Sequence, residues 1–360
     1  MLLTNAGTYN MKLLLLICLF LFGTVLFNTA TVSAGSSLLS GKQPNAAIDT
    51  KGAIRVVFGK GNDIYTISST DNGQSFSEPE KIATLPDMHL GMSRGPQIAS
   101  SKNYSLVTAM DKAGNIHAYQ LKHSNGKWTR AAGVNDVKGS APEGLVALTA
   151  DKEDNFYAVW LDTRGDKKNK IFFSSLHPGK GSWSANKLVY TSPDQTVCEC
   201  CKPNIAFHGD KLTISFRNWL NGSRDIYHTS STDKGKNFTA PQKFGQGTWK
   251  LEGCPMDGGG IVVGDNGLVS SVWQRKGEIF YCQENQPEQL IGTGRDCALA
   301  QAGANTVIVW QEKGQIKLKK LATNTTLELG HGNTPRVYAV AGGKTLCLWE
   351  DAGTVQHKLI

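Results

Sequence analysis

Apolar and polar residues alternate along most of this chain in short runs, and the runs recur in pairs. The first run of each pair is strongly apolar, and these runs span residues 54–58, 105–109, 156–160, 212–216, 268–273, 306–310 and 345–349. Each is followed by an alternating run, and these span 63–68, 115–121, 170–174, 224–229, 278–282, 315–320 and 354–359. A period of two with glycine-rich turns predicts antiparallel hairpins. No stretch beyond residue 34 has a convincing helical period, so the pattern predicts an all-β protein.

A turn motif follows two of the alternating runs. The pattern Ser-x-Asp-x-Gly-x-x-Phe occurs at 69–76 and at 231–238, and reduced copies occur at 123–128 and 181–183. Asp can accept hydrogen bonds from nearby backbone N–H groups, Gly allows a positive φ, and the aromatic residue can anchor the turn in apolar surface. The aromatic residues of the four copies lie 52, 55 and 55 residues apart and are Phe76, Trp128, Trp183 and Phe238. A period near 50 is typical of propeller blades or solenoid repeats.

The two complete turns resemble the Asp box, or BNR repeat, of the sialidase superfamily, whose fold is a β-propeller. In that family the box is structural, so the resemblance concerns the fold rather than the chemistry. The repeat count predicts seven blades of four antiparallel strands, whereas analogy with sialidases implies six. The seventh copy contains no run for an outer strand, and residues 36–42 could supply one and close the ring.

Residues 1–34 predict a secretory signal peptide. Lys12 precedes an apolar run at 13–27, and Val32-Ser33-Ala34 fits a small-x-small cleavage site. The run is short for a membrane span, and an uncleaved anchor is the alternative. We therefore expect residues 35–360 to form a single propeller domain, secreted or periplasmic, with no stable membrane span after cleavage.

Charge narrows the class of partner. Removal of residues 1–34, which carry one Lys and no acidic residue, lowers the net charge from +8 to +7. This modest excess suits an anionic glycan or glycoprotein. No basic stripe accompanies a nucleic-acid motif, so nucleic acid is not an expected partner. No cofactor is expected, and nothing in the sequence indicates an oligomeric state.

Four of the seven cysteines beyond residue 34 lie in two expected crossovers between blades. They are Cys198, Cys200, Cys201 and Cys254. In an oxidising compartment one or two disulfides are the default expectation, and the odd total leaves at least one cysteine outside such pairs. The alternatives are redox chemistry or a thiolate site for a soft metal such as copper or zinc, assisted by His89 or Met256.

Charged residues are concentrated in segments that should share one face of the propeller. In an up-and-down blade, the turns between the two middle strands and the crossovers lie opposite the Asp-type turns. Arg is suited to bidentate capture of a carboxylate, so this face predicts a binding site, with inter-blade salt bridges as the alternative. The predicted binding residues are Asp162, Arg164, Arg217, Asn218, Arg224, Asp225 and Asp257.

The sialidase resemblance also implies a catalytic set on this face. Sialidases grip the substrate carboxylate with three arginines and use a Tyr–Glu pair as nucleophile and an Asp as acid/base. Ser93-Arg94-Gly95-Pro96 matches the Arg and Pro of the family's R-I-P motif but not the residue between them. The residues that the resemblance assigns are Arg94, Asp111, Glu143, Arg275, Arg336 and Tyr281, with Tyr338 as the alternative nucleophile and Glu252 as the alternative to Glu143.

Three functions are compatible with the sequence. The first is an exported sialidase-like propeller, an exo-α-sialidase or other glycoside hydrolase acting on sialylated or other anionic glycans. The second is a non-catalytic propeller that binds a glycan or a protein. The third is a propeller with a cysteine-rich disulfide or soft-metal site at the mouth of its channel.

Overall fold

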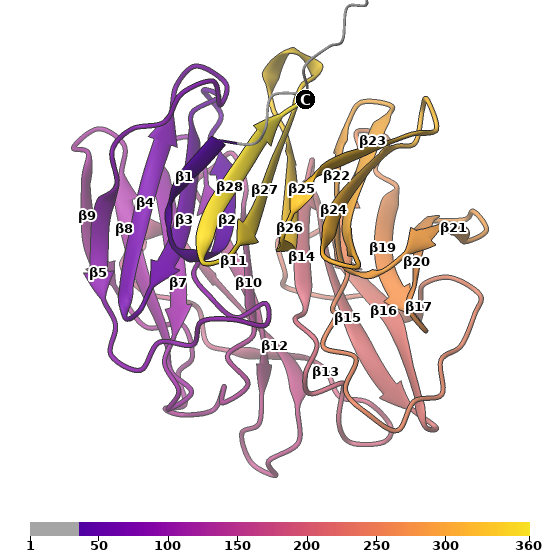
Figure 1. The fold of residues 1–360 in the computed structure, drawn as a ribbon. Coiled ribbons are helices and arrows are strands. Elements are labelled where there is room, and N and C mark those ends of the chain that lie inside the picture. The colour runs from indigo at the N-terminus through magenta and orange to yellow at the C-terminus, as the bar shows by residue number, and fades with distance from the viewer. Residues whose placement is uncertain (1–35) are drawn as a thin grey trace, which may run out of the picture. The chain divides into compact units, whose positions relative to one another are not determined.

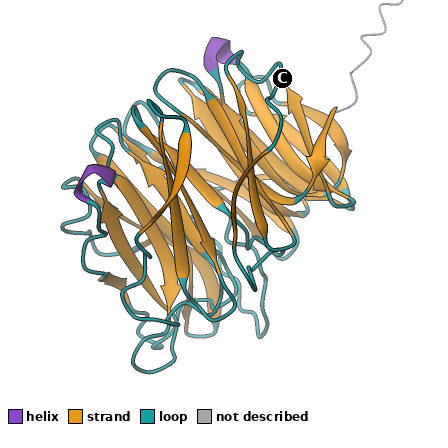
Figure 2. Ribbon diagram, turned by 90° about the vertical axis from the view of Figure 1, so that its left-hand side faces the viewer, coloured by secondary structure: helices purple, strands orange, loops and turns teal. Residues whose placement is uncertain are grey.

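Hairpins of antiparallel strands repeat through the whole of residues 36–360, which are the residues that the computed structural model describes (Figure 1). Nearly all regular secondary structure in these residues is β-strand, and their only helical segments are two short 3₁₀ turns, η1 (Pro178–Lys180) and η2 (Ala341–Gly343) (Figure 2). In this range no helix is long and apolar enough to cross a bilayer. The predicted signal peptide lies outside the described residues.

The strands form seven four-stranded antiparallel sheets, which are the blades of a β-propeller. The first blade contains β2 (Lys42–Ile48), β3 (Ile54–Lys60), β4 (Asp63–Ser69) and β5 (Glu80–Thr84). The second contains β6 (Gln97–Ser100), β7 (Tyr104–Met110), β8 (Ile116–Lys122) and β9 (Lys127–Ala131). The third contains β10 (Val146–Ala150), β11 (Phe156–Asp162), β12 (Lys170–Leu176) and β13 (Lys187–Tyr190). The fourth contains β14 (Asn204–His208), β15 (Lys211–Leu220), β16 (Ser223–Ser231) and β17 (Gln242–Lys243).

The last three blades follow the same order from the inner to the outer strand. The fifth contains β18 (Gly260–Val263), β19 (Val269–Arg275), β20 (Glu278–Gln283) and β21 (Gln289–Thr293). The sixth contains β22 (Arg295–Ala302), β23 (Asn305–Glu312), β24 (Gln315–Lys320) and β25 (Thr325–His331). The seventh contains β26 (Asn333–Ala339), β27 (Thr345–Asp351), β28 (Thr354–Leu359) and β1 (Ser36–Ser40). The count of seven is confirmed, and the six blades implied by analogy with sialidases are wrong for this chain.

The N-terminal strand closes the ring. Strand β1 pairs with β28, with Leu39 opposite Val355, and the backbone N–H of Gly41 donates to the carbonyl of Gly353 at 2.9 Å. The closing segment is shorter than the expected 36–42, because Lys42 already begins the inner strand of the first blade. Closure in this way covers the edge of β28 and gives the seventh blade four strands like the others.

Each junction between neighbouring blades has its own apolar core. At the junction of the second and third blades, Leu106 and Ile116 pack with Phe156 and Trp160. The seventh and first blades are joined in the same way by a cluster that includes Phe58 and Leu348. Seven such clusters, one for each junction, hold residues 36–360 together by apolar burial between blades.

The two complete turn motifs have the same hydrogen bonds. In the fourth blade, Oδ1 of Asp233 accepts the backbone N–H of Asn237, and Oγ of Ser231 accepts that of Gly235. The bond from the Asn237 backbone, followed by one that the Ser231 hydroxyl donates to Oδ1 at 2.7 Å, lowers the pKa of Asp233 to about 2. Ser69, Asp71, Gly73 and Ser75 repeat this pattern in the first blade. Phe238 packs edge-on against Phe173. The motif is therefore a structural turn between the third and outer strands.

The crossovers between blades are of two kinds. Four are long and span residues 85–96, 132–145, 191–203 and 244–259. Three consist of one glycine each and are Gly41, Gly294 and Gly332. A Cβ at Gly294 would lie 2.2 Å from the carbonyl oxygen of Gln311, and one at Gly332 would lie 2.4 Å from that of Glu350. The long crossovers and the turns between the middle strands lie on one face of the propeller, which we call the crossover face.

Candidate functional site

A polar cavity of about 210 Å³ lies in the channel, lined by the inner strands of all seven blades. Three lining residues from neighbouring blades form a hydrogen-bonded chain. The amide of Asn45 donates to Gln97 at 2.7 Å, and the hydroxyl of Tyr338 donates to Asn45 at 2.6 Å. Asn204, on β14, adds another amide to the wall. The wall thus offers several donors and acceptors held by rigid strands.

Two cationic side chains, Lys202 and Arg336, line this cavity. Burial first, and then the nearby Arg336, lower the pKa of Lys202 to about 7. The Lys202 ammonium donates to Asn204 at 3.3 Å, and the Arg336 guanidinium donates to the carbonyl of Pro335 at 2.9 Å. Because neither forms an ion pair among residues 36–360, both cations remain available to an anion in the cavity.

Two carboxyl groups, Asp257 and Asp296, share another part of the wall. Asp257 is buried, and its two oxygens accept the backbone N–H groups of Gly259 at 3.0 Å and Asp296 at 2.9 Å. Burial, and secondarily the negative charge of Asp257, raise the pKa of Asp296. A carboxyl group whose pKa is raised can act as a proton donor near neutral pH.

Arg94, which follows the lining residue Ser93 in the chain, meets Glu143 where two long crossovers come together. Nε of Arg94 donates to the carbonyl of Glu143 at 2.5 Å, and its Nη2 lies 3.8 Å from the carboxylate. Burial raises the pKa of Glu143, although Arg94 opposes the shift. Within the described chain, the buried Nη1 of Arg94 and Nε2 of His89 have no hydrogen-bond partner.

The other residues assigned from the sialidase resemblance do not join this group. Asp111 closes its own turn by accepting from His117 at 2.8 Å and from Asn115, and these bonds outweigh burial and lower its pKa. Arg275 forms a bidentate pair with Glu288 at 2.6 and 3.0 Å and lies over the ring of Phe280. Of the three arginines, only Arg336 lines the cavity.

Tyr281 is buried in the junction of the fifth and sixth blades, among Val272, Ile279 and Leu299. Its hydroxyl lies 3.2 Å from the hydroxyl of Ser270. No Glu has a hydrogen bond to Tyr281 in residues 36–360, so the expected Tyr–Glu pair is not assembled there. The alternative, Tyr338, lines the cavity but donates to Asn45.

Asp162 and Arg164 support a crossover. The buried Asp162 accepts from Ser140 and from the indole of Trp160, and it pairs with Arg164 at 2.8 Å. Arg164 also pairs with Asp136 at 2.7 Å. These contacts are salt bridges that tie a crossover to its blade, so for Asp162 and Arg164 they match the salt-bridge alternative rather than the predicted binding site.

Arg217 and Asn218 lie in strand β15 rather than in a loop beyond residue 216, and Arg224 and Asp225 lie in strand β16. The hairpin is longer than predicted because Asn221 and Gly222, both with positive φ, form the tight turn beyond it. Asn218 donates to Tyr190 at 3.0 Å, and Asp225 pairs with Lys243 at 2.9 Å. Arg217 is 1% exposed, and its guanidinium donates to the carbonyls of Arg224, Asp257 and Gln274.

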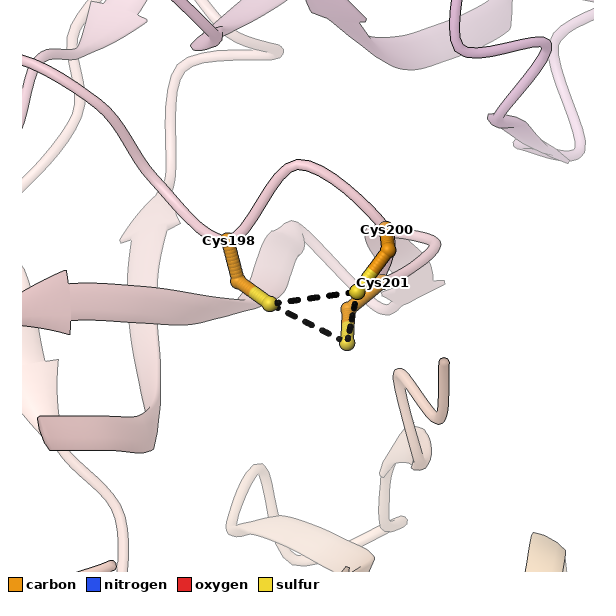
Figure 3. A group of neighbouring side chains, drawn as sticks. All are labelled: Cys198, Cys200 and Cys201. Atoms are coloured by element: carbon orange, nitrogen blue, oxygen red, sulfur yellow. Dashed lines mark hydrogen bonds between the residues drawn. The ribbon is translucent and has the colours of Figure 1, made fainter. Parts of the chain in front are cut away.

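The four cysteines of the two crossovers come together next to this hairpin. Cys200 and Cys254 form a disulfide between crossovers 191–203 and 244–259, which confirms the expected link. Cys198 and Cys201 are unpaired and buried, with their sulfurs 3.3 Å apart (Figure 3). The hydrogen bond between the Cys198 and Cys201 sulfurs is the main cause that lowers the pKa of Cys198, to about 7, and the Arg224 guanidinium at 3.0 Å adds to it.

Sequence reasoning missed the lining residues Asn45, Gln97, Lys202 and Asn204. Each stands in or just before an inner strand and next to a proline, and Asn45, Gln97 and Asn204 directly precede a short apolar run. That position is the signal that could have identified them. It is weak in a single sequence, because the same pattern describes a strand with one solvent-exposed face.

No protein-family model matches this sequence, and no curated protein matches it. Solved structures do match. The α-L-arabinanase of Penicillium chrysogenum is 11% identical with a TM-score of 0.52, over 91% of this chain and 97% of that one. A polysaccharide lyase, an ulvan lyase bound to a glucuronate–sulfated rhamnose unit, is 9% identical with a TM-score of 0.56, over 91% and 94%.

A sialidase also matches, with a lower TM-score. The NanB sialidase of Streptococcus pneumoniae is 11% identical with a TM-score of 0.47, over 91% of this chain and 69% of that one. Identities this low establish the propeller fold alone. Activity and ligand have to be argued from the residues of this chain.

Proposed function

We propose that this protein is an exported propeller that binds the end of an anionic glycan in its channel cavity. The observation that supports this most directly is the pair of cations, Lys202 and Arg336, that line a cavity rich in amides. Amide and hydroxyl groups suit sugar hydroxyls, and the cations suit a carboxylate or sulfate. At about 210 Å³ the cavity is below the usual ~300–1,000 Å³ of a drug-sized ligand, which fits one terminal sugar residue.

The lowered pKa of Lys202 supports an anionic rather than a neutral ligand. Burying an ammonium group without a counter-ion is unfavourable, so burial in the cavity wall, with Arg336 nearby, holds Lys202 near its midpoint of protonation. An anion in the cavity would supply the missing counter-charge. Two propellers of similar fold, the arabinanase and the ulvan lyase, act on polysaccharides, and the ulvan lyase was solved with a uronate-containing one.

Glycoside hydrolysis is the second candidate, and the carboxyl pair Asp257 and Asp296 favours it. Two adjacent carboxyl groups in different environments are the usual arrangement for acid–base cleavage of a glycosidic bond. Asp296, with its raised pKa, would be the proton donor. In an exo-α-sialidase, Arg336 would contact the substrate carboxylate with Arg94 beside it. The tyrosine nucleophile is the unmatched part of that assignment, because Tyr281 lies in a junction core and Tyr338, which lines the cavity, donates to Asn45 rather than to a Glu.

The test is binding and turnover with defined saccharides. Purified protein is titrated with sialyllactose, with a glucuronate oligosaccharide and with neutral lactose, by calorimetry, and products are followed by chromatography. We expect saturable binding of at least one of the two anionic saccharides and none of lactose. Lys202→Met and Arg336→Gln should each weaken it by about 1.5–3 kcal/mol, the range for hydrogen bonds to charged groups.

Lys152→Met is the matched control, because Lys152 is exposed in a turn on the opposite face. It should bind like the unmodified protein. Turnover that disappears in Asp296→Asn would establish hydrolysis, and binding without products would leave a lectin-like function. Equal affinity for lactose and sialyllactose would refute the anionic-glycan proposal.

A further inference from the structure

We propose that Cys198, Cys200, Cys201 and Cys254 form a redox-gated site for one thiophilic d¹⁰ metal ion, of the Zn²⁺ or Cu⁺ class. The site is closed while the Cys200–Cys254 disulfide is present and is completed when that bond is reduced. It is independent of the glycan proposed for the channel.

The spacing of the sulfur atoms supports a metal site. The three sulfurs of crossover 191–203 point toward one another (Figure 3), with separations of 3.3 Å for Cys198–Cys201, 3.8 Å for Cys198–Cys200 and 3.9 Å for Cys200–Cys201. Thiolates that share a tetrahedral ion at ~2.3 Å are about 3.8 Å apart. The loop therefore already places three ligands at nearly the right spacing.

The fourth ligand comes from the other crossover. Cys254 is bonded to Cys200, so its sulfur lies beside the same triangle. Reduction by a thiol reductant transfers two electrons and two protons, which converts the disulfide into two thiols while the reductant becomes a disulfide. On metal binding each ligating thiol loses its proton. Cys254 is exposed, whereas the other three are buried, so a reductant can reach the bond from its side.

The surroundings of the cluster suit thiolates. Nη1 of Arg224 lies 3.0 Å from the sulfur of Cys198, and the same guanidinium pairs with Glu199 at 3.2 Å. Arg217, which is fully buried, is held against the backbone of Arg224 and Asp257. A cluster of four thiolates around a Zn²⁺ or Cu⁺ ion is negatively charged, and buried guanidinium groups offset that charge. Such outer partners tune metal affinity.

A purely structural disulfide knot is the competing explanation. It would pair Cys198 with Cys201 as well, because their sulfurs are close and the compartment is oxidising. The two explanations differ in the state of these two thiols and in what happens after reduction. In a knot, reduction loosens the crossovers and creates no site.

The experiment uses the full chain, reduced with a metal-free phosphine under anaerobic conditions. One portion receives Zn²⁺ and another receives Cu⁺, followed by desalting, elemental analysis and alkylation mass spectrometry. We expect one ion per chain in the reduced protein and none in the protein whose Cys200–Cys254 bond is intact. X-ray absorption should show sulfur at ~2.3 Å for Zn²⁺. The two portions show which ion of the class is held.

Variants separate the site from the fold. Cys198→Ser and Cys201→Ser should lose the ion, and Arg224→Gln should bind it ~10–100-fold more weakly. Cys347→Ala, in a junction core of the sixth and seventh blades, is the control and should bind normally. Thermal unfolding shows that each variant is folded. Reduced protein that keeps no ion, ion retention unchanged in Cys198→Ser, or a native Cys198–Cys201 disulfide would overturn the proposal.

Discussion

Single buried polar side chains determine the chemistry of the crossover face. Arg217 replaces water for three backbone carbonyls, those of Arg224, Asp257 and Gln274. Lys202 is kept near its midpoint of protonation by its burial. Such groups tolerate substitution poorly, because removing one partner leaves the other buried without a hydrogen bond.

Binding of an anionic saccharide should depend on pH through Lys202. Its pKa in the free protein is about 7 instead of the ordinary 10.5, and an anion favours the charged form. Affinity should therefore fall as pH rises above 7, by up to about tenfold per unit. Deprotonation of Asp296, whose pKa is raised, acts in the same direction. Calorimetric titrations at several pH values give the slope.

Lys202→Arg is the informative variant for this prediction, because a guanidinium stays charged through this range. The pH dependence above 7 should be largely removed in it. An unchanged slope would assign the dependence to another group, with Asp296 the first to examine.

Arg217→Met should destabilise the fold by about 3 kcal/mol, because leaving each buried acceptor without its donor costs about 1 kcal/mol or more. Three carbonyls would lose their donor. Urea unfolding measures the change. Arg295→Met, at a side chain that is 56% exposed, should change stability little. A loss below 1 kcal/mol for Arg217→Met would mean that water replaces the guanidinium.

At the scale of elements, the two complete turn motifs differ in the space around their glycines. Gly73 and Gly235 have the same backbone angle, with φ of +86° and +85°. A Cβ at Gly73 meets Ile54 at 3.4 Å, an ordinary contact, whereas a Cβ at Gly235 would lie 2.4 Å from the ring of Phe173. Both copies therefore need glycine for its backbone conformation, but only Gly235 also needs it because a larger side chain would collide with a neighbour.

Gly73→Ala should lower the free energy of unfolding by about 1–2 kcal/mol, which is the penalty that an L-residue incurs at a positive φ. Gly235→Ala should cost more by about 1–3 kcal/mol, because the methyl group also displaces Phe173. Denaturant unfolding of both variants measures the difference. Equal losses would show that Phe173 moves aside at no cost.

The crossovers are the elements that carry candidate chemistry. The long crossovers 85–96, 132–145, 191–203 and 244–259 supply Arg94, Glu143, the cysteines and Asp257, whereas the single-glycine crossovers supply no side chain. Crossovers 191–203 and 244–259 also touch closely. A Cβ at Gly258 would lie 2.0 Å from the carbonyl oxygen of Lys202. The two segments that carry the cysteine cluster therefore also supply Lys202 and Asp257 to the cavity wall.

Residues 36–360 as a whole are stabilised by seven junction cores and by closure of the ring. Strand β1 completes the seventh blade, whose core also packs on the first blade. Because the cavity is lined by every blade, its shape depends on closure.

A protein that starts at Gly41 should be less stable than one that starts at Ser36. It lacks β1, so β28 has a free edge. With a net value of about 1 kcal/mol for each ladder hydrogen bond, the loss should be a few kcal/mol. Thermal unfolding and limited proteolysis of the two proteins check this. A peptide of residues 36–40 added in trans should partly restore protection if edge pairing is the cause. Equal melting temperatures would contradict the role of β1.

The sequence by itself determined the repeated unit. Alternation with a period of two, glycine at turns and the Asp-type motif are local requirements, so they predicted the all-β class, seven copies and the structural role of Asp71 and Asp233. They also placed Cys198, Cys200, Cys201 and Cys254 in neighbouring crossovers, which is why one or two disulfides could be expected there, although the sequence left the pairing open.

Only the tertiary structure decided which polar groups meet. Arg275 faces Glu288 and Tyr281 enters a junction core, because the direction of a side chain depends on strand register and on the neighbouring blade. Lys202 and Arg336, more than a hundred residues apart in sequence, meet because ring closure brings the inner strands around one channel. The repeat is specified by local sequence, whereas the site forms only when closure of the ring brings distant residues together.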